Sequence, residues 1–102
     1  MKKWKMRFTL ESSRLLSKLP PENKMLIKQA LTELRLNPHM GKDLQEELSG
    51  FKSLKLKQYR IIYNINEEKN FIQIYHIGQR RDVYQQLRRL LTEFKNPKGP
   101  LF

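Results

Sequence analysis

The sequence contains no cysteine and only four glycines among its 102 residues. The absence of cysteine excludes disulfides, cysteine zinc sites and a thiol nucleophile. The four glycines form no glycine-rich loop that could surround a nucleotide phosphate. No apolar run approaches the roughly 18 residues of a membrane helix. Residues 1–9 carry four basic side chains and no apolar signal-peptide core, so we expect a cytoplasmic protein without a membrane partner.

Histidine is also scarce, because His39 and His76 are the only two. Neither has a carboxylate at a recognisable metal-ligand spacing, and Ser12 and Ser13 lack any motif of a serine nucleophile. We therefore expect no metal site and no cofactor.

Acidic residues are few: 10 stand against 21 lysines and arginines, giving a net charge of +11 at pH 7. A field of this sign attracts polyanions and speeds their encounter with the protein. Solubility alone needs a charge of only about 2 to 8 in a small domain. The charge therefore favours nucleic acid or an acidic protein as the partner.

The first forty residues predict a strand followed by two helices. Residues 4–9 alternate between apolar and polar side chains, as a half-buried strand does. Residues 10–19 have leucines at helical spacing, with Ser12 or Ser13 as possible caps. The apolar residues of 22–36 recur at i, i+3, i+4 and i+7, which predicts an amphipathic helix. These are Ile27, Ala30, Leu31 and Leu34.

A polar loop over residues 37–43 should lead to three strands. Gly50 marks a turn, and segments 51–57, 59–65 and 71–77 then alternate or carry strand-forming residues. The last two should form a hairpin, and Gly78 should end the final strand.

The C-terminal part predicts a third helix over about residues 81–94, because its apolar residues form one stripe. Residues 95–102 contain two prolines and a glycine and should be a loosely ordered tail. The order β-α-α-β-β-β-α predicts an α+β fold in one domain, residues 1–94. We expect a three-to-four-stranded, mostly antiparallel sheet with the N-terminal helical hairpin on one face.

The strand pattern predicts a basic sheet surface. Lys55 and Lys57 should project from the same side of one strand, and Arg60 lies on the next. Since a sheet face buries apolar groups and isolated buried charge is costly, this face should stay open to an anion. Solvated charge on an ordinary outer face remains the alternative.

A second group begins at the third helix, where Arg80, Arg81, Tyr84 and Arg88 would share one side. Tyr84 could instead be a tyrosine at the edge of the core, and His76 a structural histidine. Cations with a tyrosine or histidine suit cleavage of RNA by its own 2′-hydroxyl. Lysine and arginine would stabilise the charge on the phosphate, and the tyrosine or histidine would move protons.

Four segments together resemble the RelE/ParE superfamily of toxins in order and spacing, over about residues 4–94. They are Leu48-Ser-Gly50, Leu54-Lys-Leu-Lys57, Tyr59-Arg-Ile-Ile-Tyr63 and Ile74-Tyr-His-Ile-Gly-Gln-Arg-Arg-Asp-Val-Tyr84. In the RelE branch the resemblance implies a compact, metal-independent ribonuclease that enters the ribosome and cuts mRNA there.

The resemblance also implies roles for single residues. Lys55 is similar to one of two family strand lysines, while Ser53 stands where the other is expected, with Lys57 as a neighbouring substitute. Arg60 matches the family arginine that holds the scissile phosphate and supports the transition state, and Arg80 matches the second active-site arginine.

Tyr84 resembles the family tyrosine implicated in proton transfer, and His76 is the alternative base. The residues expected to contact RNA around this site are Lys52, Lys57, Arg81 and Arg88.

The other branch, ParE, resembles the same scaffold but inhibits DNA gyrase. Lys55, Arg60, Arg80 and Tyr84 together favour RelE, while Ser53 is the best argument for an inactive, binding-only relative. Each branch implies a cognate antitoxin, acidic where it binds the toxin, that covers the site or displaces the last helix. We expect the toxin alone to be a monomer and to form a hetero-oligomer with the antitoxin.

Overall fold

The fold begins with a strand and a pair of helices. The computed structural model describes residues 4–79 and 88–89. In it β1 (Lys5–Phe8) leads into α1 (Leu10–Ser17), and α2 (Pro21–Leu36) follows after a short turn. α2 begins at Pro21 because the first helical turn needs no N–H from that residue. The predicted strand and helical hairpin are confirmed.

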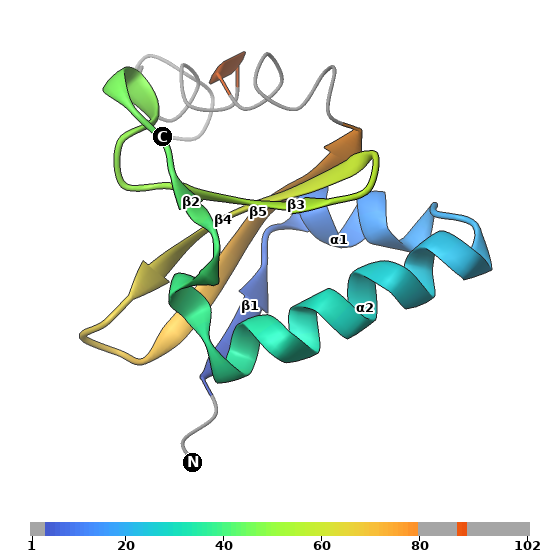
Figure 1. Cartoon of the computed structure of the whole chain (residues 1–102), viewed down its shortest axis with the longest axis horizontal. Coiled ribbons are helices and arrows are strands. Elements are labelled where there is room, and N and C mark those ends of the chain that lie inside the picture. Colours follow the sequence, from blue (N-terminus) through green and yellow to red (C-terminus); the bar gives the residue numbers. More distant parts are fainter. Residues whose placement is uncertain (1–3, 80–87, 90–102) are drawn as a thin grey trace.

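One sheet contains all the strands of the described chain. β2 (Lys42–Asp43), β3 (Lys52–Leu56), β4 (Tyr59–Asn66) and β5 (Phe71–Gln79) join β1 in the order β1-β5-β4-β3-β2. β1 runs parallel to β5, and all other neighbours are antiparallel. Figure 1 shows both helices on one side of this sheet. The predicted α+β class is confirmed.

The sheet has more strands than the three to four that we expected. Residues 37–43, predicted as a loop, contain a 3-10 helix, η1 (Pro38–Met40), and the short strand β2. Both β2 residues are exposed, so no apolar alternation marks them. Their backbone pairs with Ser53 and Lys52, and the Lys52 ammonium also contacts the Asp43 carboxylate. This pairing is tertiary, and the local sequence does not encode it.

The core lies between the helices and the sheet. The buried residues of α2 are the four predicted from its apolar stripe. They pack against the helix-side residues of β3, β4 and β5, which are Leu54, Tyr59, Ile61, Tyr63, Ile72, Ile74 and Ile77. Because side chains alternate along a strand, Arg60 and Ile62 must point to the opposite face.

The start of α1 is attached directly to β5. Its N-cap is Thr9, whose Oγ1 accepts a hydrogen bond from the Ser12 N–H at 3.1 Å, so the expected caps Ser12 and Ser13 were wrong. Ser12 is instead completely buried, and its hydroxyl donates to the carbonyl oxygen of Ile74 at 2.9 Å. The serine thus links helix to sheet, a contact that depends on tertiary structure.

The segment after α2 is held by a buried tyrosine. The Tyr63 hydroxyl donates to the Pro38 carbonyl oxygen at 2.7 Å and accepts from the Gly41 N–H at 3.0 Å. Burial raises the pKa of Tyr63 to about 12. A side chain at Gly41 would overlap this hydroxyl, so glycine is needed there for the close approach.

β5 continues through Gly78, which we expected to end it, and Gly78 pairs with Arg60 of β4. The register shifts between Ile62 and Tyr63 of β4: Ile62 pairs with His76 and Tyr63 with Ile74, so Tyr75 is the extra residue of a bulge. His76 therefore lies inside the strand and not at its end.

The predicted helix over residues 81–94 and the predicted tail over 95–102 lie outside the described residues, apart from Arg88 and Arg89, which have helical backbone. Within the part of the chain that is described, no helix is both long enough and apolar enough to span a bilayer.

Candidate functional site

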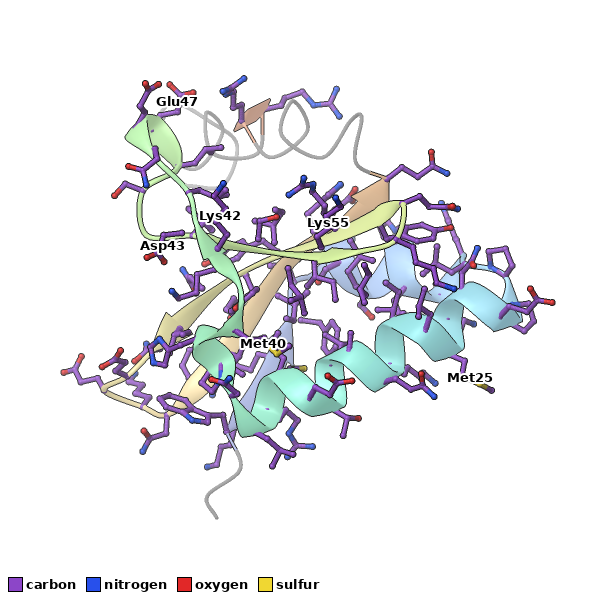
Figure 2. The ribbon with its side chains drawn as sticks, in the orientation of Figure 1. Met25, Met40, Lys42, Asp43, Glu47 and Lys55 are labelled. Atoms are coloured by element: carbon purple, nitrogen blue, oxygen red, sulfur yellow. The ribbon has the colours of Figure 1, made fainter. Side chains whose placement is uncertain are left out.

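The sheet face opposite the helices brings two of the predicted site residues together. Lys55 of β3 pairs with Arg60 of β4, and Arg60 pairs with Gly78 of β5. Directly opposed residues in a sheet share a face, so these three residues form one row across the sheet. Lys55 is exposed, and Figure 2 shows it on β3, across the sheet from α2.

Ser53 contacts the arginine of this row. Its side chain is almost fully buried, with 3% exposed, and its Oγ accepts a hydrogen bond from Arg60 Nη1 at 3.1 Å. Arg60 is half-buried. A charged donor bonded to a buried hydroxyl loses conformational freedom, so Ser53 orients the guanidinium that the row presents.

His76 lies in the neighbouring row, opposite Ile62. Only 3% of it is exposed, and its Nδ1 has no hydrogen-bond partner among the described residues. Burial lowers the pKa of His76, and the nearby Glu11 carboxylate opposes that shift in part. The imidazole is therefore neutral at pH 7, the form that accepts a proton.

The space over Gly78 is limited by the same histidine. A Cβ at position 78 would lie 2.7 Å from His76 Nε2 and 3.3 Å from its Cδ2. The absence of a side chain at Gly78 therefore leaves room for the imidazole beside the Lys55–Arg60 row.

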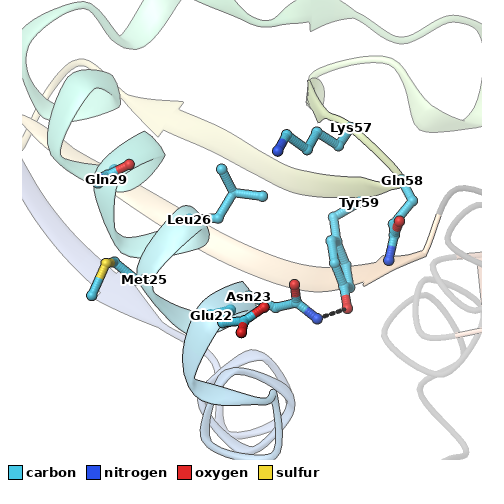
Figure 3. Close-up of a pocket in the computed structure, with 8 residues that line it drawn as sticks. All are labelled: Glu22, Asn23, Met25, Leu26, Gln29, Lys57, Gln58 and Tyr59. Carbon is cyan, nitrogen blue, oxygen red and sulfur yellow. Dashed lines mark hydrogen bonds between the residues drawn. The ribbon is translucent and has the colours of Figure 1, made fainter.

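Lys57 does not join this face, so the prediction that it shares a side with Lys55 was wrong. β3 ends at Leu56, and Lys57 adopts a positive φ of 51° in the turn to β4. Its side chain lines a pocket of about 250 Å³ with residues of α2 (Figure 3). In that pocket Asn23 Nδ2 donates to the Tyr59 hydroxyl at 2.8 Å. The two-residue turn interrupts the alternation.

Two of the residues predicted to contact RNA have carboxylate partners. The Lys52 ammonium contacts Asp43 of β2. Arg88 Nε donates to Glu47 Oε1 of η2 (Glu46–Leu48) at 2.7 Å, and both side chains are more than half exposed. The Arg88–Glu47 pair, exposed on both sides, contributes about 0–1 kcal/mol. The Lys52 side chain is only 16% exposed, and Lys52 pairs with Tyr63, so it does not share the face of Lys55.

Arg80, Arg81 and Tyr84, which sequence reasoning assigned to the site, lie outside the described residues. In the segments 4–79 and 88–89, no group of three histidine, aspartate or glutamate side chains is placed to hold a metal ion.

An apolar cluster supports the middle of the outer face. Leu48 and Ile62 are buried there, with Leu44, Phe51 and Tyr75 packed around them. The Phe51 and Tyr75 rings meet edge to face, with centroids 4.9 Å apart. The cluster fixes the sheet surface on which the Lys55–Arg60 row stands.

Sequence reasoning missed the contributions of Ser53 and Gly78 to this geometry. Ser53 was noted only as a missing lysine, and Gly78 only as a strand breaker. The pairing of Ser53 could have been found by extending the 57–58 hairpin residue by residue, which aligns position 53 with 62 and position 55 with 60. The pairing of Gly78 with Arg60 could not, because the bulge shifts the register between β4 and β5.

Comparison with known proteins identifies this fold as that of RelE-like toxins. The toxin-antitoxin complex RelBE2 from Mycobacterium tuberculosis matches with a TM-score of 0.73 and 32% identity, over 80% of this chain and 97% of that chain. The isolated RelE toxin of E. coli matches with a TM-score of 0.67 over 86% of this chain and 98% of that one. At 20% identity, the second match shows the fold alone.

The sequence comparisons give the family. The model of the ParE toxin of type II toxin-antitoxin systems matches residues 18–84. Toxin RelG of Mycobacterium tuberculosis is 34% identical over 82 residues, which is 78% of this chain and 94% of that toxin. The chain therefore belongs to the RelE/ParE family, as the sequence resemblance indicated, and is a toxin of a type II toxin-antitoxin system.

Proposed function

We propose that this toxin is an endoribonuclease that cleaves mRNA on the ribosome and so inhibits translation. The observation that carries the proposal is the Lys55–Arg60 pair on the outer sheet face, with Arg60 oriented by Ser53. In the reaction the RNA 2′-oxygen attacks the adjacent phosphorus while the 5′-oxygen leaves, giving a 2′,3′-cyclic phosphate and a 5′-hydroxyl. Arg60 and Lys55 stabilise the charge that builds on the phosphate oxygens.

Two residues are candidates for proton transfer. Tyr84 has this role by family resemblance, and with Arg80 it would complete the site. His76 is the alternative, because its imidazole is neutral and lies in the row next to Arg60. No step of this chemistry requires a metal ion.

A cognate antitoxin is the second partner that we propose. The net charge of +11 favours an acidic binding segment. The similar RelBE2 structure is that of a toxin-antitoxin complex. We propose that the free toxin is a monomer and that the antitoxin covers the Lys55–Arg60 row.

The experiment is primer extension on a defined mRNA in a purified bacterial translation reaction, with and without ribosomes. Arg60→Ala should lower cleavage by roughly 10²–10³ or more, as loss of a transition-state donor does. Arg14→Ala, which removes an exposed arginine of α1, is the matched control. If Arg60→Ala leaves cleavage intact, the proposed site is wrong.

A ParE-like function, inhibition of DNA gyrase, is the second candidate, because the matching family model is that of ParE toxins. A gyrase supercoiling assay with the purified toxin tests it. Inhibition of supercoiling without RNA cleavage would select this function. If the toxin neither cleaves RNA nor inhibits supercoiling, it is a binding-only relative.

A further inference from the structure

The outer sheet face continues beyond the basic row toward the β4–β5 hairpin. Asn64 lies four residues after Arg60 on β4, on the same face, and so about 13 Å along the strand. Asn64 pairs with Gln73 of β5, and Gln73 pairs with Arg7 of β1. A single-stranded RNA chain bound at Arg60 could reach this second row within a few nucleotides.

The second row borders a pocket of about 350 Å³. The polar residues that line it are Asn64, Asn66, Glu67, Glu68, Gln73 and Tyr75. Asn66 is engaged in the turn, where its Oδ1 accepts the Lys69 N–H at 2.9 Å. Among the described residues Asn64 makes one long contact, donating from Nδ2 to the Tyr75 hydroxyl at 3.4 Å. Toward the described part of the chain, the Asn64 and Gln73 amides therefore retain most of their hydrogen-bonding capacity.

Amide side chains suit the edge of a nucleobase. Each carries a donor and an acceptor side by side, the arrangement that pairs with base edges. Sequence-specific proteins read unstacked bases of single-stranded RNA in this way, beside an aromatic ring. Tyr75 supplies a half-buried ring here, held by Phe51.

The charges of the pocket indicate which part of RNA enters it. The Glu67 and Glu68 carboxylates repel phosphate but can accept hydrogen bonds from amino groups of bases. No lysine or arginine is among the described residues that line the pocket. Arg60 lies further along β4, paired with Lys55, and Arg7 lies beside Gln73 in the second row. The Arg7 guanidinium stacks 4.5 Å from the centroid of the Phe71 ring. The arrangement fits a backbone outside the pocket and a base within it.

We propose that Asn64 and Gln73 bind one base of the RNA substrate and thereby determine the sequence preference of cleavage. This inference rests on the proposed ribonuclease function. It assigns the β4–β5 end of the sheet to recognition and the Lys55–Arg60 row to phosphate chemistry.

The test compares wild type with Asn64→Ala, Gln73→Ala and Gln73→Glu on a panel of mRNAs. These differ in the bases flanking one cleavage site, and the amount cut at each is measured by primer extension in the translation reaction. Loss of an amide should reduce the ratio of cutting at preferred over disfavoured sites roughly tenfold to 100-fold. Gln73→Glu keeps the shape but only accepts hydrogen bonds, so it should shift the preference toward bases that present amino groups.

Gln29→Ala, which removes an exposed amide from α2, is the matched control and should keep the wild-type pattern. Cleavage by all variants with an unchanged site preference would overturn the inference and leave the ribonuclease function intact. If wild type cuts no RNA, the ribonuclease proposal fails and the inference fails with it. Thermal melts of each variant separate loss of recognition from loss of folding.

Discussion

Replacement of Gly78 by alanine should displace His76, because the two residues are two positions apart on β5 and face the same side of the sheet. The added Cβ would lie 2.7 Å from His76 Nε2, closer than the van der Waals radii of nitrogen and carbon allow. The imidazole is only 3% exposed, so it cannot swing into solvent. Either the ring must move away from position 78, and so away from the Lys55–Arg60 row, or the backbone of β5 must shift.

The expected cost follows from two opposing effects. Inserting a methyl group into a packed site costs about 1–3 kcal/mol. Alanine also restricts the unfolded chain relative to glycine, which stabilises the fold by about 0.4–1 kcal/mol. The free energy of unfolding should therefore fall by up to about 2.6 kcal/mol, with a decrease of roughly 4–8 °C in the melting temperature for each kcal/mol.

Urea denaturation of a double-mutant cycle checks this account. In a His76→Ala background the clash is absent, so Gly78→Ala should be neutral or stabilising by up to about 1 kcal/mol. The coupling between the two positions should then be about 1–3 kcal/mol. An equal effect of Gly78→Ala in both backgrounds would refute the reasoning.

Three further outcomes follow from single contacts. Tyr63→Phe removes two buried hydrogen bonds, one of them to the Gly41 N–H, and should cost about 1–3 kcal/mol in urea denaturation. Ser53→Ala removes the hydrogen bond between Ser53 Oγ and the Arg60 guanidinium and should slow cleavage roughly tenfold to 100-fold without unfolding the protein; an unchanged rate would show that Ser53 does not orient Arg60. Burial lowers the pKa of His76 below its ordinary value of 6.5, so the unfolded chain binds more protons between the folded pKa and 6.5. Stability should be full above about pH 6.5 and fall as the pH drops toward the folded pKa. His76→Gln should flatten this dependence, as followed by urea denaturation at several pH values.

The spacing of apolar residues was sufficient to predict the helices and strands that bury one apolar face. The stripe of α2 was correct at each position, because a helix against a sheet must bury residues at i, i+3, i+4 and i+7. The segment 59–65 also forms a strand, β4, as predicted, with Tyr59, Ile61 and Tyr63 in the core on the helix side. For such elements, the local pattern and the tertiary structure obey the same constraint.

Features without a buried face could not be predicted in this way. β2 consists of two exposed residues that pair only because β3 lies beside them. Lys57 continues the apparent alternation of β3, yet it occupies the turn in a left-handed conformation. The alternation of lysines with apolar residues does not show at which residue the strand ends and the hairpin turn begins.

The arrangement of the basic face follows from the pairing of β3 with β4 and not from its net charge alone. Ser53, which breaks the family pattern of two strand lysines, contacts Arg60 from below the surface. A lysine at this position would add charge at a site that is 97% buried, at a high desolvation cost. The buried serine hydroxyl instead accepts a hydrogen bond from Arg60 and so orients its guanidinium. Phosphate binding at this row would then depend on the placement of Arg60 and Lys55 more than on the number of positive charges. Lys55→Arg should therefore lower the cleavage rate although it keeps the positive charge. Comparison of Lys55→Arg with Lys55→Ala in the cleavage assay tests this: equal activity of wild type and Lys55→Arg would show that charge alone suffices.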